Sequence, residues 1–233
     1  MKIAVLGTGV VGQTLAEKLL SLGHDVTIGT RDVKKVLTTK AKDQFGRPAF
    51  GQWHSNHLNI KVASFAEAAA SGEIVINATN GMGSLNALED AGHDHLKNKI
   101  LLDVSNPLDF SHGMPPGLWV SNTDSLGEKI QRAFPETKVV KSLHTMTAYL
   151  MVNPSLVPGD HTVFLSGNDA DAKLKIRGLL ITFGWKDENI LDLGNITSAR
   201  GTEQIVPLWI NIMNTLQHPY FNFRMVIGRP PQI

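Results

Sequence analysis

The first two thirds of the chain predict an α/β fold built on a doubly wound parallel sheet. Short apolar runs rich in β-branched residues alternate with helical patterns as far as Ser142, and this alternation is typical of parallel sheets. A glycine-rich turn joins the first strand to the first helix, and the last third of the chain loses the regular alternation. We therefore expect a large α/β domain over residues 1–142 and a small α/β C-terminal lobe over residues 143–233.

The N-terminal β-α-β unit carries the most specific motif. An apolar strand over Lys2–Leu6 leads into Gly7-x-Gly9-x-x-Gly12, a helix follows, and a second strand covers Asp25–Gly29. In this context the first glycine permits a tight turn, the second lets a pyrophosphate approach the backbone, and the third lets the helix pack on the strand. The helix N-terminus offers free N–H groups to phosphates. The unit predicts a Rossmann-type dinucleotide site, and a glycine turn in an empty α/β unit is the weaker alternative.

The residues after the second strand indicate which dinucleotide binds. An NAD site usually has Asp or Glu there for the ribose 2′-OH, whereas an NADP site has Arg nearby. Thr30 can donate to a 2′-phosphate, Arg31 can bind it with its guanidinium fork, and Lys35 adds a charge. Asp32 either competes for this position or caps the next helix. We expect NADP(H) rather than NAD(H), although Lys34 and Lys35 fit a solvated helix face equally well.

Composition narrows the classes of function. The 233 residues are 42% hydrophobic and 18% charged, with a formal net charge of +1, which is ordinary for a globular protein and gives no argument for nucleic acid or an anionic membrane as a partner. The absence of cysteine excludes disulfides and thiolate chemistry. His54 and His57 lack acidic neighbours, so no metal site is expected. With no signal peptide or membrane helix evident, we expect a cytoplasmic protein.

Strands and helices continue to alternate after the first unit. Strands are expected over Ile60–Ala63, Glu73–Ala78, Lys99–Val104 and Lys138–Ser142, and helices over Asp32–Asp43, Phe65–Ser71, Leu85–Leu96 and Asp124–Ala133. Ser64 and Glu67 have the spacing of a capping box, and Asp124 is the expected N-cap of its helix. Two segments lack periodicity: Gln44–Asn59 is expected to be a loop over the sheet edge or a subunit contact, and Leu108–Asn122 a lid or binding loop.

The last third of the chain adds a different set of elements. A strand over Thr162–Ser166, a helix over Asp169–Phe183, a strand over Ile190–Leu193, a final helix from about Ile196 to Gln217 and an extended tail over Tyr220–Ile233 are expected. Pro219 is expected to end the final helix. That helix has an apolar stripe made of Ile205, Leu208, Trp209, Ile212, Met213 and Leu216. The stripe fits either a core face or a dimer contact, so a homodimer is plausible.

Polar turns follow several strands at the sheet edge where open α/β sheets place ligands. Thr79 and Asn80 are candidate contacts to the nicotinamide-side ribose or the substrate, and a plain strand-to-helix turn is as well supported. His144 stands in a polar turn after the sixth strand, where it can orient a carbonyl or donate to a developing anion. A histidine that tethers its own loop is the alternative.

Three segments then resemble a known family. They are GTGVVG with GTRD, KVVKSLHTM, and DLGNITSARGTEQIVPLWINIM, and the match runs from Lys2 to about Met225. The sequence is similar to the deazaflavin (coenzyme F420)-dependent NADP reductases and to the NADPH-binding domain of the STEAP metalloreductases. The resemblance implies an NADPH oxidoreductase that exchanges a hydride with a small-molecule acceptor, either a deazaflavin or a flavin such as FMN. The alternatives are a reductase of free flavin, ferric chelates or imines, and a non-catalytic NADPH sensor.

The resemblance also implies roles for individual residues. By this resemblance, the pyrophosphate would be bound by Gly7, Thr8, Gly9, Val10 and Val11, with Gly12 completing the motif. The 2′-phosphate would be bound by Thr30, Arg31 and Lys35. The ribose and nicotinamide would lie near Ala78, Thr79, Asn80, Ser105, Asn106 and Pro107. The acceptor pocket would be lined by His144, Thr145 and Met146 and closed by the start of the last helix. Among these, His144 is the catalytic candidate.

Overall fold

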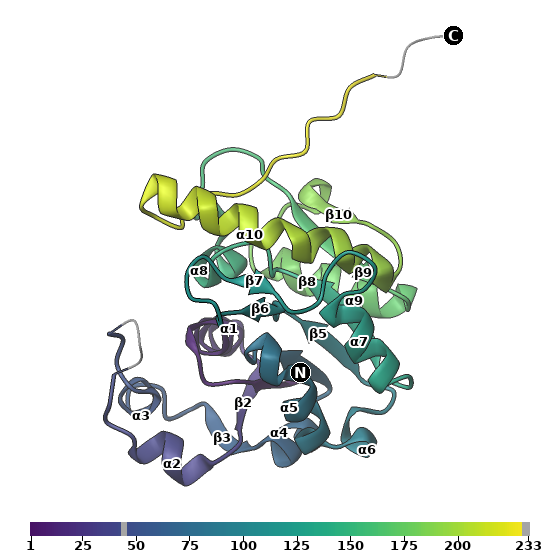
Figure 1. The fold of residues 1–233 in the computed structure, drawn as a ribbon. Coiled ribbons are helices and arrows are strands. Elements are labelled where there is room, and N and C mark those ends of the chain that lie inside the picture. The colour runs from purple at the N-terminus through teal and green to yellow at the C-terminus, as the bar shows by residue number, and fades with distance from the viewer. Residues whose placement is uncertain (43–45, 230–233) are drawn as a thin grey trace.

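A single eight-stranded sheet forms the centre of the protein in a computed structural model that describes residues 1–42 and 46–229 (Figure 1). Its strands are β1 (Lys2–Leu6), β2 (Asp25–Thr30), β3 (Lys61–Ser64), β4 (Ile74–Asn77), β5 (Ile100–Asp103), β8 (Lys138–Ser142), β9 (Val163–Gly167) and β10 (Ile190–Asp192). They lie in the order β10-β9-β8-β5-β4-β1-β2-β3. Six neighbouring strands of the sheet, β8, β5, β4, β1, β2 and β3, are parallel to one another. Strand β9 runs antiparallel to β8, and β10 is parallel to β9. The predicted Rossmann-type α/β sheet is confirmed, and the expected C-terminal lobe shares this sheet.

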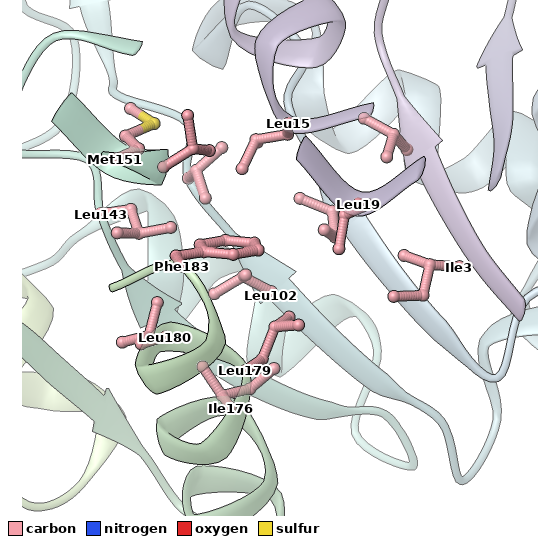
Figure 2. Close-up of a cluster of buried hydrophobic side chains, with 14 of the residues drawn as sticks. Ile3, Leu15, Leu19, Leu102, Leu143, Met151, Ile176, Leu179, Leu180 and Phe183 are labelled. Carbon is pink, nitrogen blue, oxygen red and sulfur yellow. The ribbon is translucent and has the colours of Figure 1, made fainter. Parts of the chain in front are cut away.

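Helices cover both faces of the sheet. They are α1 (Val10–Ser21), α2 (Val33–Thr38), α3 (Phe50–His54), α4 (Phe65–Ser71), α5 (Ser84–Ala91), α6 (His93–Leu96), α7 (Leu126–Ala133), α8 (Ala148–Val152), α9 (Ala170–Thr182) and α10 (Ala199–Leu216). Successive side chains of β1 point to opposite faces, so Ile3 belongs to one buried cluster and Ala4 to the other. Figure 2 shows the first cluster, which brings together Leu19 of α1, Leu102 of β5 and Leu179 of α9. Fully burying one such side chain contributes about 1.5–3 kcal/mol.

Local capping signals are mostly confirmed. The Ser64 hydroxyl accepts from the Glu67 amide at 3.2 Å, and the Glu67 carboxylate accepts from the Ser64 amide at 2.9 Å, which is the predicted capping box. The prediction for Asp124 is wrong, because Ser125 caps α7 by accepting from the Glu128 amide at 3.1 Å. The Asp124 carboxylate instead forms an ion pair with the last turn of that helix.

Several expected boundaries are wrong where tertiary contacts override local pattern. The second helix ends at Thr38 rather than Asp43, and residues 43–45 lie outside the described residues. The expected loop Gln44–Asn59 contains α3, a helix too short to show periodicity on its own. A glycine in the left-handed region, Gly92 with φ of 91°, divides the expected helix Leu85–Leu96 into α5 and α6.

The expected loop Leu108–Asn122 also has structure. It contains a small antiparallel hairpin formed by β6 (Leu108–Asp109) and β7 (Gly117–Leu118). Within the described residues, no helix combines the length and apolarity that crossing a membrane requires. The cytoplasmic location stays a prediction.

The final helix faces the core with a different side from the one expected. Its buried residues are Ala199, Thr202, Glu203, Val206 and Ile210, whereas Leu208 and Leu216 of the predicted stripe are exposed. The other four residues of the stripe, Ile205, Trp209, Ile212 and Met213, are half-buried. None of the stripe belongs to the buried face, and its role as a dimer contact stays a prediction. The helix ends at Leu216, one residue before the expected Gln217, and the left-handed C-cap Gln217, with a φ of 59°, terminates it before Pro219 is reached. The tail has no helix or strand as far as residue 229. It stays on the body as far as Met225, whose amide donates to the Thr162 hydroxyl at 3.1 Å, and then extends away from the body (Figure 1).

Candidate functional site

The glycine turn after β1 is shaped by close backbone contacts. Gly7 has a φ of +123°, and a Cβ there would lie 2.5 Å from the carbonyl oxygen of Ala78. A Cβ on Gly12 would lie 2.1 Å from the carbonyl oxygen of Gly7. A Cβ on Gly9 would meet no atom within 4 Å. Contacts within the chain thus require the first and third glycines, while the second opens onto free space where a ligand can approach the backbone.

The N-terminus of α1 is open to an anion. Its N-cap Gly9 has no side chain to cap the first amides, and the first turn has no acidic residue. The Gln13 side chain donates to the carbonyl of Thr8 at 2.8 Å and so braces the turn. Unpaired N–H groups and the helix dipole favour negative charge at such an end. This arrangement fits the diphosphate of a dinucleotide.

A pocket of about 1180 Å³ opens beside this turn. It brings together six of the predicted cofactor residues, namely Thr8, Gly9, Val10, Thr30, Arg31 and Lys35. Arg47 lines it as well, so cations from two parts of the chain surround the space. The Asp32 carboxylate accepts from the Lys35 amide at 2.8 Å and caps α2, which agrees with the capping alternative. The pocket thus has the charge that a phosphorylated ribose requires.

The turns after β4, β5 and β8 meet at the same edge of the sheet. A Cβ on Gly81 would lie 1.8 Å from the carbonyl oxygen of Asn106, so the first two turns are in contact. The Asn106 amide donates to the carbonyl of His144 at 2.8 Å and joins the third turn. The structure therefore gathers the predicted residues Ala78, Thr79, Asn80, Ser105, Asn106, Pro107, His144, Thr145 and Met146 along one edge, outside the walls of the 1180 Å³ pocket. Val11 packs against the core instead.

A buried network of charged side chains lies beneath these turns. The Lys141 ammonium contacts Asp103 at 2.8 Å and Glu203 at 2.9 Å, and all three side chains are almost completely buried. The same ammonium donates to the carbonyl of Ser105 at 2.7 Å, and Asp103 accepts from the Asn77 amide at 2.9 Å. Burial by itself lowers the pKa of Lys141, but the charges of the two carboxylates outweigh it and raise that pKa. The network therefore fixes the turns after β4 and β5.

The prediction from sequence did not include this network. Asp103 ends β5 directly after three apolar residues, and Lys141 follows Val139 and Val140 in β8. A charge next to such apolar residues indicates a buried, paired group. That signal was available. The third member, Glu203, lies in the long final helix and also accepts from the amides of Leu126 and Gly127 at the start of α7, at 2.8 and 3.0 Å. No local pattern identifies that contact.

His144 lies inside the protein, and neighbouring Thr145 and Met146 are buried as well. Neither ring nitrogen of His144 has a hydrogen-bond partner among the described residues. Burial, and then the Lys141 ammonium, lower the pKa of His144 well below its ordinary value of 6.5. The backbone carbonyls of Ser142 and Thr202 offset this in part, although neither meets hydrogen-bond geometry with the ring. The imidazole is therefore neutral at physiological pH.

This shift predicts acid sensitivity with a definite sign. Below pH 6.5 the unfolded chain protonates His144 while the native chain does not. The free energy of unfolding that depends on neutral His144 is therefore fully present above pH 6.5 and is lost as the pH falls toward the pKa of His144 in the native protein. We expect His144→Gln to reduce the loss of unfolding free energy between about pH 7.5 and 5.5 in urea titrations. His112→Gln, at an exposed histidine, is the matched control. Equal losses in the wild type and His144→Gln would contradict the assignment.

The chain is similar to known proteins along most of its length. A model of the family described as NADP oxidoreductase, coenzyme F420-dependent, matches residues 2–107. The F420-dependent NADP reductase of Methanothermobacter marburgensis is 28% identical over 221 residues, which is 91% of this chain and 92% of that protein. Metalloreductase STEAP3 of Rattus norvegicus is 27% identical over 215 residues, covering 89% of this chain and 38% of that protein. The crystal structure of a candidate F420-dependent NADP-reductase from Arthrobacter sp. FB24 is 53% identical, with a TM-score of 0.91 over 97% of this chain and 100% of that one.

Proposed function

Because the chain belongs to the family of coenzyme F420-dependent NADP oxidoreductases, we propose that it transfers a hydride between NADP(H) and a deazaflavin of the coenzyme F420 type. Membership makes the protein an NADP-dependent oxidoreductase, and the acceptor is the proposal. The observation that carries the proposal is the length of the match: the alignment with the Methanothermobacter marburgensis reductase covers 91% of this chain and 92% of that enzyme. The similarity therefore includes the last third of the chain as well as the NADP-binding part.

The described geometry fits NADP(H) at both ends. Gly9 and the N-terminus of α1 would receive the diphosphate, and Arg31 and Lys35 the 2′-phosphate. The turns after β4 and β5, held by the Lys141 network, would orient the nicotinamide end. Bound NADPH supplies the hydride, and the protein contributes alignment with the acceptor. The proposal places His144 on the acceptor side of these turns as a neutral group.

The acceptor is tested by kinetics with the purified protein. NADPH oxidation is followed by the loss of reduced-nicotinamide absorbance, with oxidised coenzyme F420 and FMN as acceptors in parallel. We expect turnover with coenzyme F420 to exceed turnover with FMN by at least about 100-fold, because binding energy at the acceptor site is realised only with the matching ring system. Fast turnover with FMN alone would identify a flavin reductase. Firm NADPH binding without turnover would favour the sensor alternative.

A ferric chelate is a second candidate acceptor, favoured by the similarity to STEAP3. The chain spans 38% of that metalloreductase, so only its matched part bears on this protein. Adding a soluble ferric chelate to the same assay separates the two candidates. Chelate reduction without added flavin or deazaflavin would favour this second function.

A further inference from the structure

The cofactor pocket has a second side that the sequence motif does not supply. Residues 46–57, with α3 at their centre, are called the outer wall here. Arg47, Phe50, Gln52 and Asn56 of this wall line the same pocket as the glycine turn and Arg31. From sequence the segment was expected to be a loop over the sheet edge or a subunit contact. Because the segment lines the same pocket as the predicted phosphate-binding residues, it has a different role.

We propose that the outer wall encloses the 2′-phosphoadenosine half of NADP(H) and that Arg47 is a further residue that selects the 2′-phosphate. This inference rests on the proposed NADP site. Three observations carry it, namely the way the wall is joined to α1, the way it is joined to α2, and the charge it contributes to the pocket.

The contact with α1 depends on one carboxylate. The Trp53 indole N–H donates to a carboxylate oxygen of Glu17, and the same oxygen lies 3.0 Å from the Nε2 of His57. The two aromatic rings stack with centroids 4.5 Å apart. His54 joins the wall to the segment that follows it, because its Nε2 lies 2.8 Å from the carbonyl oxygen of Ile60. The histidine pair noted in the sequence therefore holds the wall, and no metal-binding cluster is found among the described residues.

The contact with α2 depends on a glycine. A Cβ on Gly51 would lie 2.3 Å from the carbonyl oxygen of Leu37 and 3.0 Å from its carbonyl carbon. Backbone atoms cannot yield as a flexible side chain can, so any other residue at this position must displace α3 from α2. Lys35 lies on α2. The wall and the predicted phosphate contacts therefore keep a fixed spacing.

The chemistry of the wall suits a phosphorylated purine nucleoside. Arg47 lines the pocket together with Arg31, and a guanidinium presents a planar set of donors that matches a phosphate. Gln52 and Asn56 offer amide donors and acceptors, and Phe50 offers an apolar surface. A phosphate between two guanidinium groups gains charge-assisted hydrogen bonds that a 2′-OH cannot match. The wall should therefore discriminate against nucleotides without the 2′-phosphate.

The test measures binding of adenosine fragments by calorimetry. The probes are 2′,5′-ADP, which has the 2′-phosphate, and 5′-ADP, which lacks it. Arg47→Ala should weaken 2′,5′-ADP about 10-fold and 5′-ADP less than about 2-fold. Gly51→Ala should weaken both probes, because it displaces the whole wall. Arg132→Ala, at an exposed arginine of α7, and Gly178→Ala, at a helical glycine with no atom within 4 Å of an added Cβ, are the matched controls and should change neither.

The outcomes separate the wall from the NADP site itself. If Arg31→Ala loses the preference for 2′,5′-ADP while Arg47→Ala keeps it, the NADP site stands and the role of Arg47 is refuted. If wild-type protein binds 2′,5′-ADP no more tightly than 5′-ADP, the NADP preference fails and the wall proposal fails with it. If Gly51→Ala does not fold, Arg47→Ala decides alone. An equal effect of Arg47→Ala on both probes would also overturn the proposal.

Discussion

Lys141→Ala is expected to lower the free energy of unfolding by about 3–5 kcal/mol. The Lys141 ammonium lies 2.8 Å from a carboxylate oxygen of Asp103 and 2.9 Å from one of Glu203. The exposed fractions of the three side chains are 0%, 0% and 2%. Removing the cation leaves two buried carboxylates without their shared partner and also removes the donor to the Ser105 carbonyl. An uncompensated buried charge is among the largest penalties that a single substitution produces.

A surface pair of nearly equal length provides the control. Lys186 contacts Asp160 at 2.7 Å, but the two side chains are 61% and 45% exposed. Water and salt screen such a pair, so Lys186→Ala should cost less than about 1 kcal/mol. Urea unfolding of the wild type and both variants measures the difference. If the two substitutions cost the same, the buried network does not stabilise the fold as described.

The parallel part of the fold is predictable because each of its strands contains short stretches of apolar residues and is followed by turn residues. The five residues of β1 and the five of β8 are recognised in this way. The outer wall is not recognisable, because the five-residue α3 depends on the backbone contact between Gly51 and Leu37 rather than on its own periodicity. The hairpin β6–β7 has two residues in each strand and carries even less local signal.

The phase of the final helix shows a different limit of sequence reasoning. An apolar stripe normally marks the buried face of a helix. On α10, however, the buried face includes Thr202 and Glu203, because the Glu203 carboxylate has ionic and amide partners inside the protein. On this helix, hydrophobicity alone therefore selects the wrong face, because a charge is buried together with its partners.

The candidate site likewise contains some residues that a local motif predicts and others that only the folded chain brings together. Gly7, Gly9, Gly12 and Arg31 belong to a local motif whose geometry is defined within about 30 residues, so the sequence alone predicts them as cofactor contacts. The Lys141–Asp103 contact joins residues 38 positions apart, and it depends on the register in which β5 and β8 pair. A charge next to apolar strand residues indicates that a partner exists, but only the folded sheet identifies that partner.

Arg31→Ala is expected to weaken NADPH by about 10- to 100-fold while changing NADH less than about 2-fold. Arg31 lies directly after β2 and lines the pocket with Thr30 and Lys35. The Asp32 carboxylate, which would favour a ribose hydroxyl, is occupied as the cap of α2. A guanidinium that binds a phosphate in a bidentate manner contributes both charge and geometry to the affinity. NADH has no 2′-phosphate, so its affinity depends on neither contribution.

Two further variants separate charge from geometry at this position. Arg31→Lys keeps the charge but loses the fork, so its NADPH affinity should fall between those of the wild type and Arg31→Ala. Lys34→Ala is the matched control, because Lys34 is exposed and does not line the pocket. Binding is measured by calorimetry at low and high salt, and the wild-type advantage for NADPH should shrink as salt screens the phosphate contact. Equal losses of NADPH and NADH affinity in Arg31→Ala would refute the selection of NADP by this residue, since only a contact with the 2′-phosphate distinguishes the two cofactors.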